Sequence, residues 1–358
     1  MSRSTRREEE STGRDAGLAE EMRDLARRAH HHFRNKTTDQ AESVMQLPVA
    51  AYRDEERYRK EFERIFTQLP LGLALSVELP SPGSYLARTI LNKPVLLTRD
   101  EGGNVRSFLN VCRHRGATVC PEGAGKRSRF VCPYHAWTFA ADGELIGLNA
   151  AGTFGEVDKT ALGLTALPCA EKSGVIWVAL DPDASFDIDD WLGEFSDKLD
   201  SLDLGNWYLY EQRDLPGPGW KITLDGYLEV YHHDTVHGKT VGKHTVGNLL
   251  VNDTYGPHQR LTFGRKTLKD LDPEDGQDWD ANQYIRIIHS VFPNLSISGI
   301  VGGHCLVSQI FPGATPQSTI TRQTLLCATK PESEADKEAA EQFSAMTLQA
   351  VRDEDYAV

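Results

Sequence analysis

The sequence has little of what marks a secreted, membrane-spanning or nucleic-acid-binding protein. Its first 29 residues are rich in Arg and Glu and contain no apolar core of the kind found in secretory signals. No segment approaches the ~18 consecutive apolar residues of a transmembrane helix. The formal net charge of -13 argues against the basic face that meets phosphates in nucleic-acid binders. We therefore expect a cytoplasmic protein that binds neither membranes nor nucleic acids.

Cysteine is also scarce, and internal repeats and low-complexity tracts are absent. Six cysteines in a chain of 358 residues, without a secretory signal, indicate thiols or metal ligands and not a disulfide framework. The hydrophobic content of 39% and the charged content of 25% are ordinary for a globular protein. A chain of this length predicts two compact units with extensions.

The N-terminal half changes character twice along the chain. Residues 1–45 are charged and weakly apolar, which predicts a mobile or loosely helical arm. Residues 46–76 form a helical lead-in, because apolar and aromatic residues recur at helical spacing between Arg53 and Phe66. Residues 77–181 alternate short β-rich runs with Gly, Pro and Asp turns, the pattern of a small antiparallel domain.

Residues 182–358 are mixed in character. The pattern predicts a helix near 220–238, strand-like runs near 247–264, 283–301 and 304–328, and a final helix from about Ser333. The polar, turn-rich stretch after Leu180 separates this region from the β-rich domain before it.

Four possible metal ligands lie in two short pairs. One residue separates Cys112 from His114, two separate Cys132 from His135, and seventeen lie between the pairs. The pattern suits a Cys2His2 zinc site, or a two-iron cluster with two thiolates on one iron and two imidazoles on the other. The single residue between the first two ligands is short for a zinc finger. Cys120 falls outside the pairs, so we expect it to be a plain core thiol.

A second group of ligand-type residues lies in "WKITLDGYLEVYHHDTVHGKT", from Trp220 to Thr240. It contains three histidines: His232, His233 and His237. Two imidazoles with one carboxylate, leaving open positions, form the iron site of non-haem Fe(II) oxygenases. Spacing alone favours His233 with His237, because residues i and i+4 share one face of a helix.

The motifs "CRHRG" and "CPYHAW" resemble the Rieske [2Fe-2S] motif of the Rieske non-haem iron oxygenases. The resemblance covers most of the chain. It implies that Cys112 and Cys132 bind one iron of the cluster, while His114 and His135 bind the other.

The resemblance also bears on the second group of ligands. The family pattern of an acid, two residues, His, four residues and His matches Glu229, His232 and His237. It therefore favours His232 over His233 as a ligand of mononuclear Fe(II). Residues i and i+5 lie about 140° apart on an ideal helix, so the resemblance implies that the helix breaks or bulges between His232 and His237.

The carboxylate ligand is expected near the end of the sequence. "VRDEDYAV" resembles the acidic signature of the family, with Asp355 at the ligand position and Glu354 before it. On an ideal helix, one row of residues at i, i+4 spacing is Phe343, Thr347, Val351 and Asp355. Asp353 lies outside this row. The family pattern usually continues to a further Glu and Gln, whereas this sequence ends three residues after Asp355.

The resemblance implies the catalytic (alpha) subunit of an aromatic-ring-hydroxylating oxygenase. We therefore expect an α+β fold with a small all-β Rieske domain at 77–181 and a catalytic domain at 182–358, in which helices cover an antiparallel sheet. O2 and a small organic substrate would react at the mononuclear iron. Electrons would come from NAD(P)H through a separate ferredoxin or flavin reductase, because no motif here binds NAD or flavin.

Two alternatives remain beside hydroxylation of an aromatic ring. The first is monooxygenation or demethylation of a quaternary ammonium compound, since some relatives with that activity carry Glu at the position of Glu229. Such a substrate calls for an aromatic cage, which Tyr255, Tyr284 and Phe292 could supply. The second is an electron-transfer protein with a vestigial second site, which would hold about two irons per chain in place of about three.

Three further expectations concern the route of electrons. Glu229 lies three residues before His232 and is expected to orient its ring. The resemblance adds a homo-oligomer, a trimer or a multiple of it, in which His135 of one subunit contacts Glu229 of the next. Three cations between the cluster ligands are expected to help dock an acidic electron donor: Lys126, Arg127 and Arg129.

Overall fold

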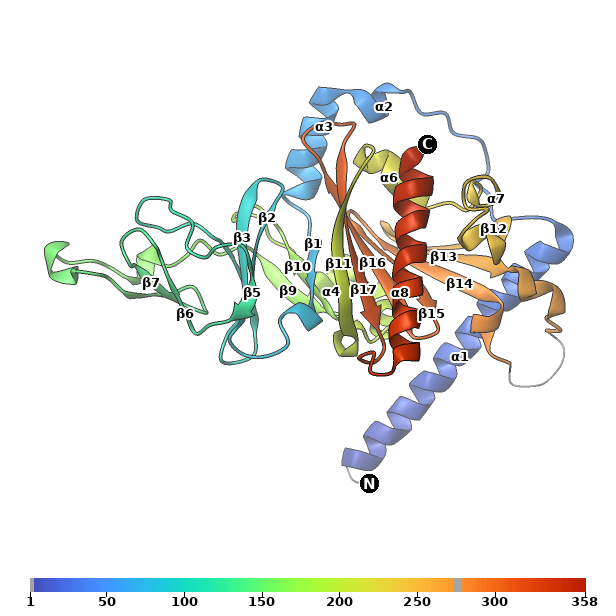
Figure 1. The fold of residues 1–358 in the computed structure, drawn as a ribbon, viewed down its shortest axis with the longest axis horizontal. Coiled ribbons are helices and arrows are strands. Elements are labelled where there is room, and N and C mark those ends of the chain that lie inside the picture. Colours follow the sequence, from blue (N-terminus) through green and yellow to red (C-terminus); the bar gives the residue numbers. More distant parts are fainter. Residues whose placement is uncertain (1–2, 274–278) are drawn as a thin grey trace. The chain divides into compact units, whose positions relative to one another are not determined.

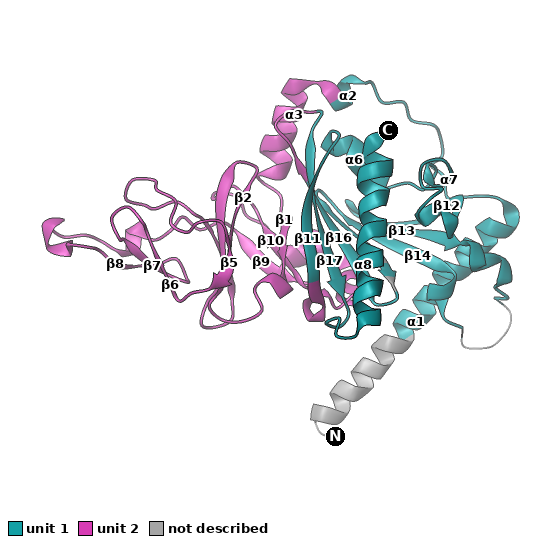
Figure 2. Ribbon diagram, viewed as in Figure 1, with its two compact units in different colours: residues 1–52, 210–310, 317–358 teal, residues 53–209, 311–316 magenta. Residues whose placement is uncertain are grey.

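The computed structural model describes residues 3–273 and 279–358 and divides into two compact units (Figure 2). Unit 1 comprises residues 1–52, 210–310 and 317–358, and unit 2 comprises residues 53–209 and 311–316. This division groups the N-terminal arm with the C-terminal part of the chain, which the sequence pattern did not predict. No helix in the described part of the chain is long and apolar enough to cross a membrane.

Unit 2 contains three small antiparallel sheets (Figure 1). The first has the order β4-β3-β2-β5 and consists of β2 (Ser84–Ile90), β3 (Lys93–Arg99), β4 (Val105–Leu109) and β5 (Gly123–Lys126). The second consists of β6 (Arg129–Val131), β7 (Thr138–Ala140) and β8 (Leu145–Gly147). The third has the order β1-β10-β9 and consists of β1 (Leu71–Leu75), β9 (Cys169–Lys172) and β10 (Val175–Val178). The predicted β-rich domain is confirmed.

Short helices precede and follow the strands of unit 2 along the sequence. The helix predicted between Arg53 and Phe66 is confirmed as α3 (Glu55–Glu61) followed by a π-helical turn at Phe62–Phe66, whereas Leu71–Leu75, in the last part of the proposed helical lead-in, form the strand β1. Asp54 caps α3, because its side chain accepts a hydrogen bond from the N–H of Arg57 at 2.6 Å. The other short helices near or in this unit are α2 (Ala50–Arg53), α4 (Ile188–Leu192) and α5 (Phe195–Asp200).

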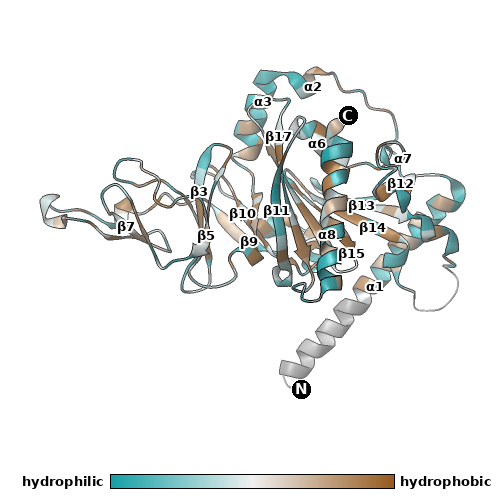
Figure 3. Cartoon of the chain, viewed as in Figure 1, coloured by the Kyte–Doolittle hydropathy of each residue, from teal (hydrophilic) through white to brown (hydrophobic). Residues whose placement is uncertain are grey.

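Unit 1 is built on a seven-stranded antiparallel sheet of order β11-β17-β16-β15-β14-β13-β12. Its strands are β11 (Tyr208–Gly217), β12 (Thr245–Tyr255), β13 (His258–Arg265), β14 (Ile285–Val291), β15 (Leu295–Val301), β16 (His304–Pro312) and β17 (Thr319–Cys327). The predicted strand runs between 247 and 328 each correspond to one hairpin of this sheet. The central strands are largely hydrophobic, whereas the edge strand β11 is mostly hydrophilic (Figure 3).

Helix α8 (Glu334–Leu348) covers one face of this sheet (Figure 1). Ser333, where the helix was predicted to start, is its N-cap, and a capping box with Asp336 satisfies the first N–H groups. Phe343 of α8 packs in one buried cluster with Leu306 and Leu325 of the sheet. The predicted α+β fold, with a helix covering an antiparallel sheet, is confirmed.

The N-terminal arm differs from its prediction. Helix α1 (Arg3–Asn35) replaces the expected mobile or loosely helical arm. Three of its side chains, Leu25, Ala26 and Ala29, are fully buried against Leu249 and Val251 of β12. The apolar stripe is short, and its two alanines allow a close approach to the sheet, so its weak hydrophobicity concealed a packed helix.

Candidate metal centres and active site

The two predicted cluster ligand pairs lie on loops of the same shape. In each loop the N–H of the cysteine, Cys112 or Cys132, donates to the carbonyl five residues later at 2.8 Å. The residue four positions after the cysteine donates back to its carbonyl, at 2.9 Å and 3.0 Å respectively. In both loops that residue has a left-handed backbone conformation, with φ 79° at Gly116 and φ 55° at Ala136. The different spacings C-x-H and C-x-x-H therefore occur on equivalent turns.

The side chains of these loops present two thiols and two imidazoles. Cys112 and Cys132 are 3% and 2% exposed and belong to the same buried core. The rings of His114 and His135 lie 4.7 Å apart and remain partly exposed, and His114 stacks on Trp137 at 4.7 Å. Buried thiols with imidazoles at the surface suit the asymmetric ligand set of a Rieske cluster.

Cys120 lies in the same core but apart from the two pairs. It is fully buried, and burial raises the pKa of its thiol, which keeps the thiol protonated. The prediction of a plain core thiol is confirmed.

The second ligand group follows helix α6 (Trp220–Tyr227) and includes the one-turn helix α7 (His233–Val236). His232 and His237 are the two residues that cap α7. The predicted break between them is wrong in position, because the chain leaves helical geometry before His232 and a helical turn joins the two histidines. As cap residues, they do not follow the 140° separation of an ideal helix, and their rings converge.

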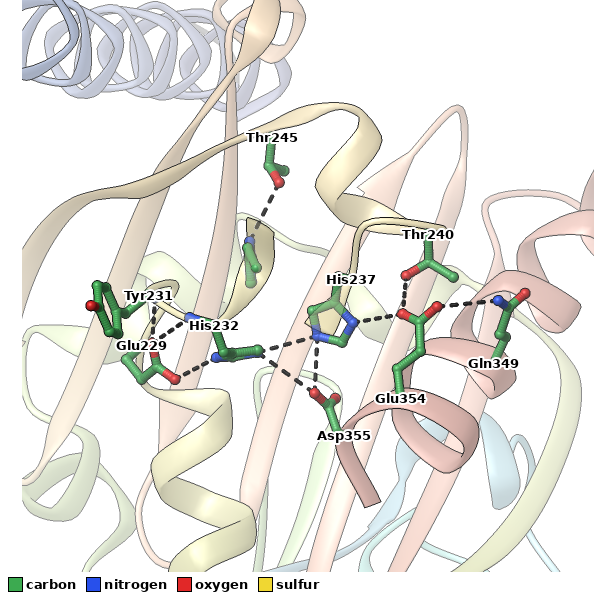
Figure 4. A network of polar contacts seen from close by, with 10 residues as sticks. Glu229, Tyr231, His232, His237, Thr240, Thr245, Gln349, Glu354 and Asp355 are labelled. Carbon is green, nitrogen blue, oxygen red and sulfur yellow. Dashed lines mark hydrogen bonds and ion pairs between the residues drawn. The ribbon is translucent and has the colours of Figure 1, made fainter. Parts of the chain in front are cut away.

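Three ligand atoms meet at one point of this site (Figure 4). The Nε2 atoms of His232 and His237 are 3.2 Å apart. Oδ1 of Asp355 lies 2.9 Å from Nε2 of His237 and 3.6 Å from Nε2 of His232. Ligands held at right angles about 2.1 Å from a metal are about 3.0 Å from one another, so this spacing fits a two-histidine, one-carboxylate iron site.

Glu229 lies behind His232, as expected, although not on a helix. Its carboxylate contacts Nδ1 of His232 and accepts the N–H groups of Tyr231 and His232, the latter at 3.3 Å. Glu229 follows the end of α6, and these backbone hydrogen bonds, in place of helical geometry, turn its side chain toward the ring.

Glu354 has the same position behind His237, which the sequence analysis missed. Its Oε2 is 2.8 Å from Nδ1 of His237 and accepts from the Thr240 hydroxyl, while Gln349 donates to its Oε1 at 3.1 Å. The chain changes from a π-helical turn, Gln349–Glu354, to a 3-10 turn that begins at Asp355. This change lets two consecutive acids reach one histidine. The position of Glu354 directly before Asp355 was the signal available in the sequence.

His233, the rival ligand, has different surroundings. One of its nitrogens lies within 4.8 Å of nitrogens of His232 and His237, so the three form one cluster. Its Nδ1, however, lies 3.4 Å from the Thr245 hydroxyl, and its ring meets Phe263 edge-on at 5.5 Å. Burial lowers the pKa of His233 to about 3, so the ring is a neutral part of the wall.

A cavity of about 220 Å³ opens beside these ligands within unit 1. One wall is the sheet, where cross-strand pairing aligns Ile288 with Ser298 and Ser298 with Leu306. The other wall is α8 with the turns that follow it, and it contains the whole predicted row: Phe343, Thr347, Val351 and Asp355. None of the three aromatic residues that could supply a cage lines the cavity: Tyr255, Tyr284 and Phe292.

Comparison with known families matches two parts of the chain. Residues 71–162 match the family described as the Rieske [2Fe-2S] domain, and residues 204–358 match the ring hydroxylating alpha subunit (catalytic domain). The glycine betaine monooxygenase oxygenase subunit of Chromohalobacter salexigens is 32% identical over 66% of this chain and 51% of that protein. This chain thus spans about half the length of that relative.

Solved structures show the same fold. A quaternary ammonium Rieske monooxygenase in complex with an inhibitor is 21% identical, with a TM-score of 0.74 over 85% of this chain and 82% of the other. Naphthalene 1,2-dioxygenase from Rhodococcus sp. bound to indole is 25% identical, with a TM-score of 0.70 over 92% of this chain and 81% of the other. The chain therefore joins a Rieske [2Fe-2S] domain to the mononuclear-iron-binding catalytic domain of the ring hydroxylating alpha subunits, and its relatives are Rieske oxygenase large subunits.

Proposed function

We propose that this chain is the terminal oxygenase component of a system that uses O2 and electrons from a separate NAD(P)H-linked reductase or ferredoxin to hydroxylate a small organic substrate. This proposal rests on the convergence of His232, His237 and Asp355 at the wall of a largely apolar cavity. The Nε2 atoms of the two histidines and Oδ1 of Asp355 all lie within 3.6 Å of one another. Iron(II) held by such a set supplies open positions at which O2 is activated.

The protein's own groups prepare both centres. Glu229 and Glu354 each accept the Nδ1 proton of one histidine, which fixes the tautomer and leaves Nε2 free to bind metal. We assign the cluster of the Rieske domain, proposed at 77–181, to one set of ligands: Cys112, His114, Cys132 and His135. In the catalytic domain, proposed at 182–358, the apolar cavity walls exclude water and hold the carbon to be oxidised.

Hydroxylation of an aromatic compound is the first choice of reaction, because a ring fits between the sheet and α8 with Phe263 and Phe343 in the walls. The second candidate is monooxygenation or demethylation of a quaternary ammonium compound. The relative named as a glycine betaine monooxygenase subunit supports this second candidate. Tyr255, Tyr284 and Phe292 do not line the cavity, so a cage of these three aromatic residues gives the second candidate no support.

We also propose a homo-oligomer, a trimer or a multiple of it, in which electrons pass from His135 of one subunit to Glu229 of the next. Both residues are partly exposed in the single chain, and each has an exposed tyrosine beside it, Tyr134 at 61% and Tyr231 at 76%. The six free cysteines support our proposal of a cytoplasmic location, where thiols stay reduced.

Iron analysis and single turnover test the proposed function together. The purified protein, reconstituted with ferrous iron, is expected to hold about three irons per chain, since a Rieske cluster accounts for two. After chemical reduction of the cluster, addition of O2 and substrate should reoxidise it and yield hydroxylated product. A chain that holds two irons, and whose cluster reoxidises without product for every substrate class, would instead be an electron carrier.

A further inference from the structure

Two arginines line the same cavity as the candidate iron ligands. Arg265 ends β13 and Arg286 lies near the start of β14, and the register pairs Phe263 with Arg286 and Gly264 with Ile285. Arg265 and Arg286 are therefore diagonal neighbours on one face of the hairpin, the face that also carries Phe263. The Phe263 ring meets His233, which lies beside His232 and His237.

The hydrogen bonds of these arginines are local and go to carbonyl groups. Nη1 of Arg265 donates to the carbonyls of Asn282 and Gln283 at 3.3 Å and 3.1 Å. Nη1 of Arg286 donates to the carbonyls of Asn282 and Ile285, the latter at 2.7 Å. A guanidinium has five N–H donors, so both groups retain donors for another partner.

No carboxylate pairs with either guanidinium in the described ranges 3–273 and 279–358. The two acids that line the cavity face histidines, Glu229 with His232 and Asp355 with His237. Burial, and then the charge of Arg265, lower the pKa of Arg286 to about 10, an effect that Asp280 opposes. Two positive charges therefore adjoin an apolar cavity. A bound anion would offset the repulsion between them and the cost of their desolvation.

We infer that the substrate is a small, otherwise largely apolar carboxylate, whose carboxyl group Arg265 and Arg286 bind. The inference rests on the proposed function and names the substrate class of the same site. Planar guanidinium groups bind carboxylates through paired, charge-assisted hydrogen bonds. The apolar body of the substrate then lies along Phe263 and Ile288, with its far carbon toward the candidate iron ligands. A neutral hydrocarbon or a simple cation leaves both arginines without an anion.

Equilibrium binding by calorimetry under nitrogen tests this inference on the iron-loaded protein. The probes are benzoate, its neutral analogue benzamide, glycine betaine and choline. Benzoate should bind roughly tenfold or more tightly than benzamide, because only the carboxylate forms charge-assisted hydrogen bonds with the two guanidinium groups. Arginine-dependent binding of glycine betaine, without binding of choline, would also support a carboxylate site and would identify a zwitterionic source. Equal binding of benzoate and benzamide by the wild type, together with failure of glycine betaine to bind, would overturn it.

Matched variants assign the preference to the arginines. Arg265→Met and Arg286→Met should each reduce the preference for benzoate over benzamide, while Lys269→Met, an exposed control on the same connection, should keep it. Cluster absorbance and iron content verify folding, and if Arg286→Met fails to fold, Arg286→Lys and Arg265→Met are used for the comparison. An unchanged preference in every folded arginine variant would refute the site. Product formation from neutral substrates alone would refute the carboxylate site but support the proposed oxygenase function. Tight carboxylate binding without O2 consumption would support the carboxylate site but refute the oxygenase function.

Discussion

Three histidines lie within one helical turn of this site, and the partner behind each ring distinguishes them. Carboxylates lie at Nδ1 of His232 and His237, whereas Nδ1 of His233 lies near a hydroxyl. An acid behind the ring raises the basicity of the far nitrogen and orients it, as is usual for metal-bound histidine. Spacing alone preferred His233, and the arrangement of partners prefers His232.

Matched substitutions of the neighbouring histidines test this assignment. His232→Asn should remove the mononuclear iron and leave about two irons per chain, because the [2Fe-2S] cluster does not depend on it. His233→Asn should keep about three irons, with a loss of stability because the buried ring packs on Phe263. Elemental analysis of the two purified variants measures this, and the opposite pattern would make His233 the ligand.

Glu354 gives a prediction for His237. Glu354→Gln replaces a charged acceptor at Nδ1 of His237 by an amide, so the affinity for ferrous iron should fall about 10–100-fold. Asp353→Asn is the matched control, because its carboxylate pairs with Arg352 at the surface, at 2.6 Å. Titration of metal-free protein with ferrous iron measures both. Equal affinities in the two variants would show that Glu354 does not orient the ligand.

Glu229 should matter for electron delivery more than for metal content. Glu229→Gln is expected to keep the fold, the cluster and most of the iron while stopping turnover, because an amide does not replace a charged acceptor between two imidazole N–H donors. Rapid-mixing measurement of cluster reoxidation, with product analysis, provides the test. Near-normal product formation from the reduced Gln variant would exclude the bridging role, and an active monomer would exclude transfer between subunits.

At the scale of elements, the end of α8 shows how helical geometry selects ligands. The α-helix changes to a π-helical turn and then to a 3-10 turn at Asp355. The α-helical row Phe343, Thr347, Val351 and Asp355 correctly identified the face toward the cavity. It did not predict that Glu354 would reach the same site, because consecutive residues point about 100° apart on an α-helix.

Helix α1 is the element whose packing the composition concealed. Leu25 is 1% exposed in the cluster with β12, so Leu25→Ala should lower the free energy of unfolding of unit 1 by about 2–4 kcal/mol. Leu18→Ala, at a partly exposed position of the same helix, should have a smaller effect. Denaturant unfolding followed by tryptophan fluorescence measures both. Equal shifts would mean that α1 does not contribute to the core.

At the scale of the whole molecule, the protein is acidic, yet three cations lie between the candidate cluster ligands along the chain. The net charge is -13, while Lys126, Arg127 and Arg129 are all exposed. Arg127 differs from the other two, because its guanidinium lies 5.1 Å from the Tyr85 ring centroid and has a packing role. The other two are better suited to test docking of an electron donor.

Charge reversal tests this docking surface. Lys126→Glu combined with Arg129→Glu should slow reduction by an acidic ferredoxin and weaken its dependence on ionic strength, because attraction between opposite charges speeds encounter. Arg59→Glu combined with Lys60→Glu, two exposed cations of α3, is the control of equal charge. Stopped-flow reduction over a range of salt concentrations measures the effect. If the two double variants behave alike, net charge and not a docking surface governs reduction.

The sequence by itself determined the features that depend on neighbours along the chain. The paired spacings of Cys112 with His114 and of Cys132 with His135 identified the cluster loops, because each loop is a local turn. Alternating and helical periodicities predicted the small β-rich domain, the strand-like runs that form most of the large sheet and the start of α8. These patterns can be recognised in the sequence alone, because each depends on a few consecutive residues.

The tertiary structure decided the features that depend on residues far apart in the chain. It brought Asp355 to His232, placed Glu354 behind His237, packed α1 on β12, and brought Arg265 and Arg286 to the cavity. None of these follows from spacing, because each contact joins segments whose approach depends on the pairing of strands and the packing of helices. Local patterns define which surfaces are apolar or bear ligands, and only the folded chain determines which of those surfaces meet.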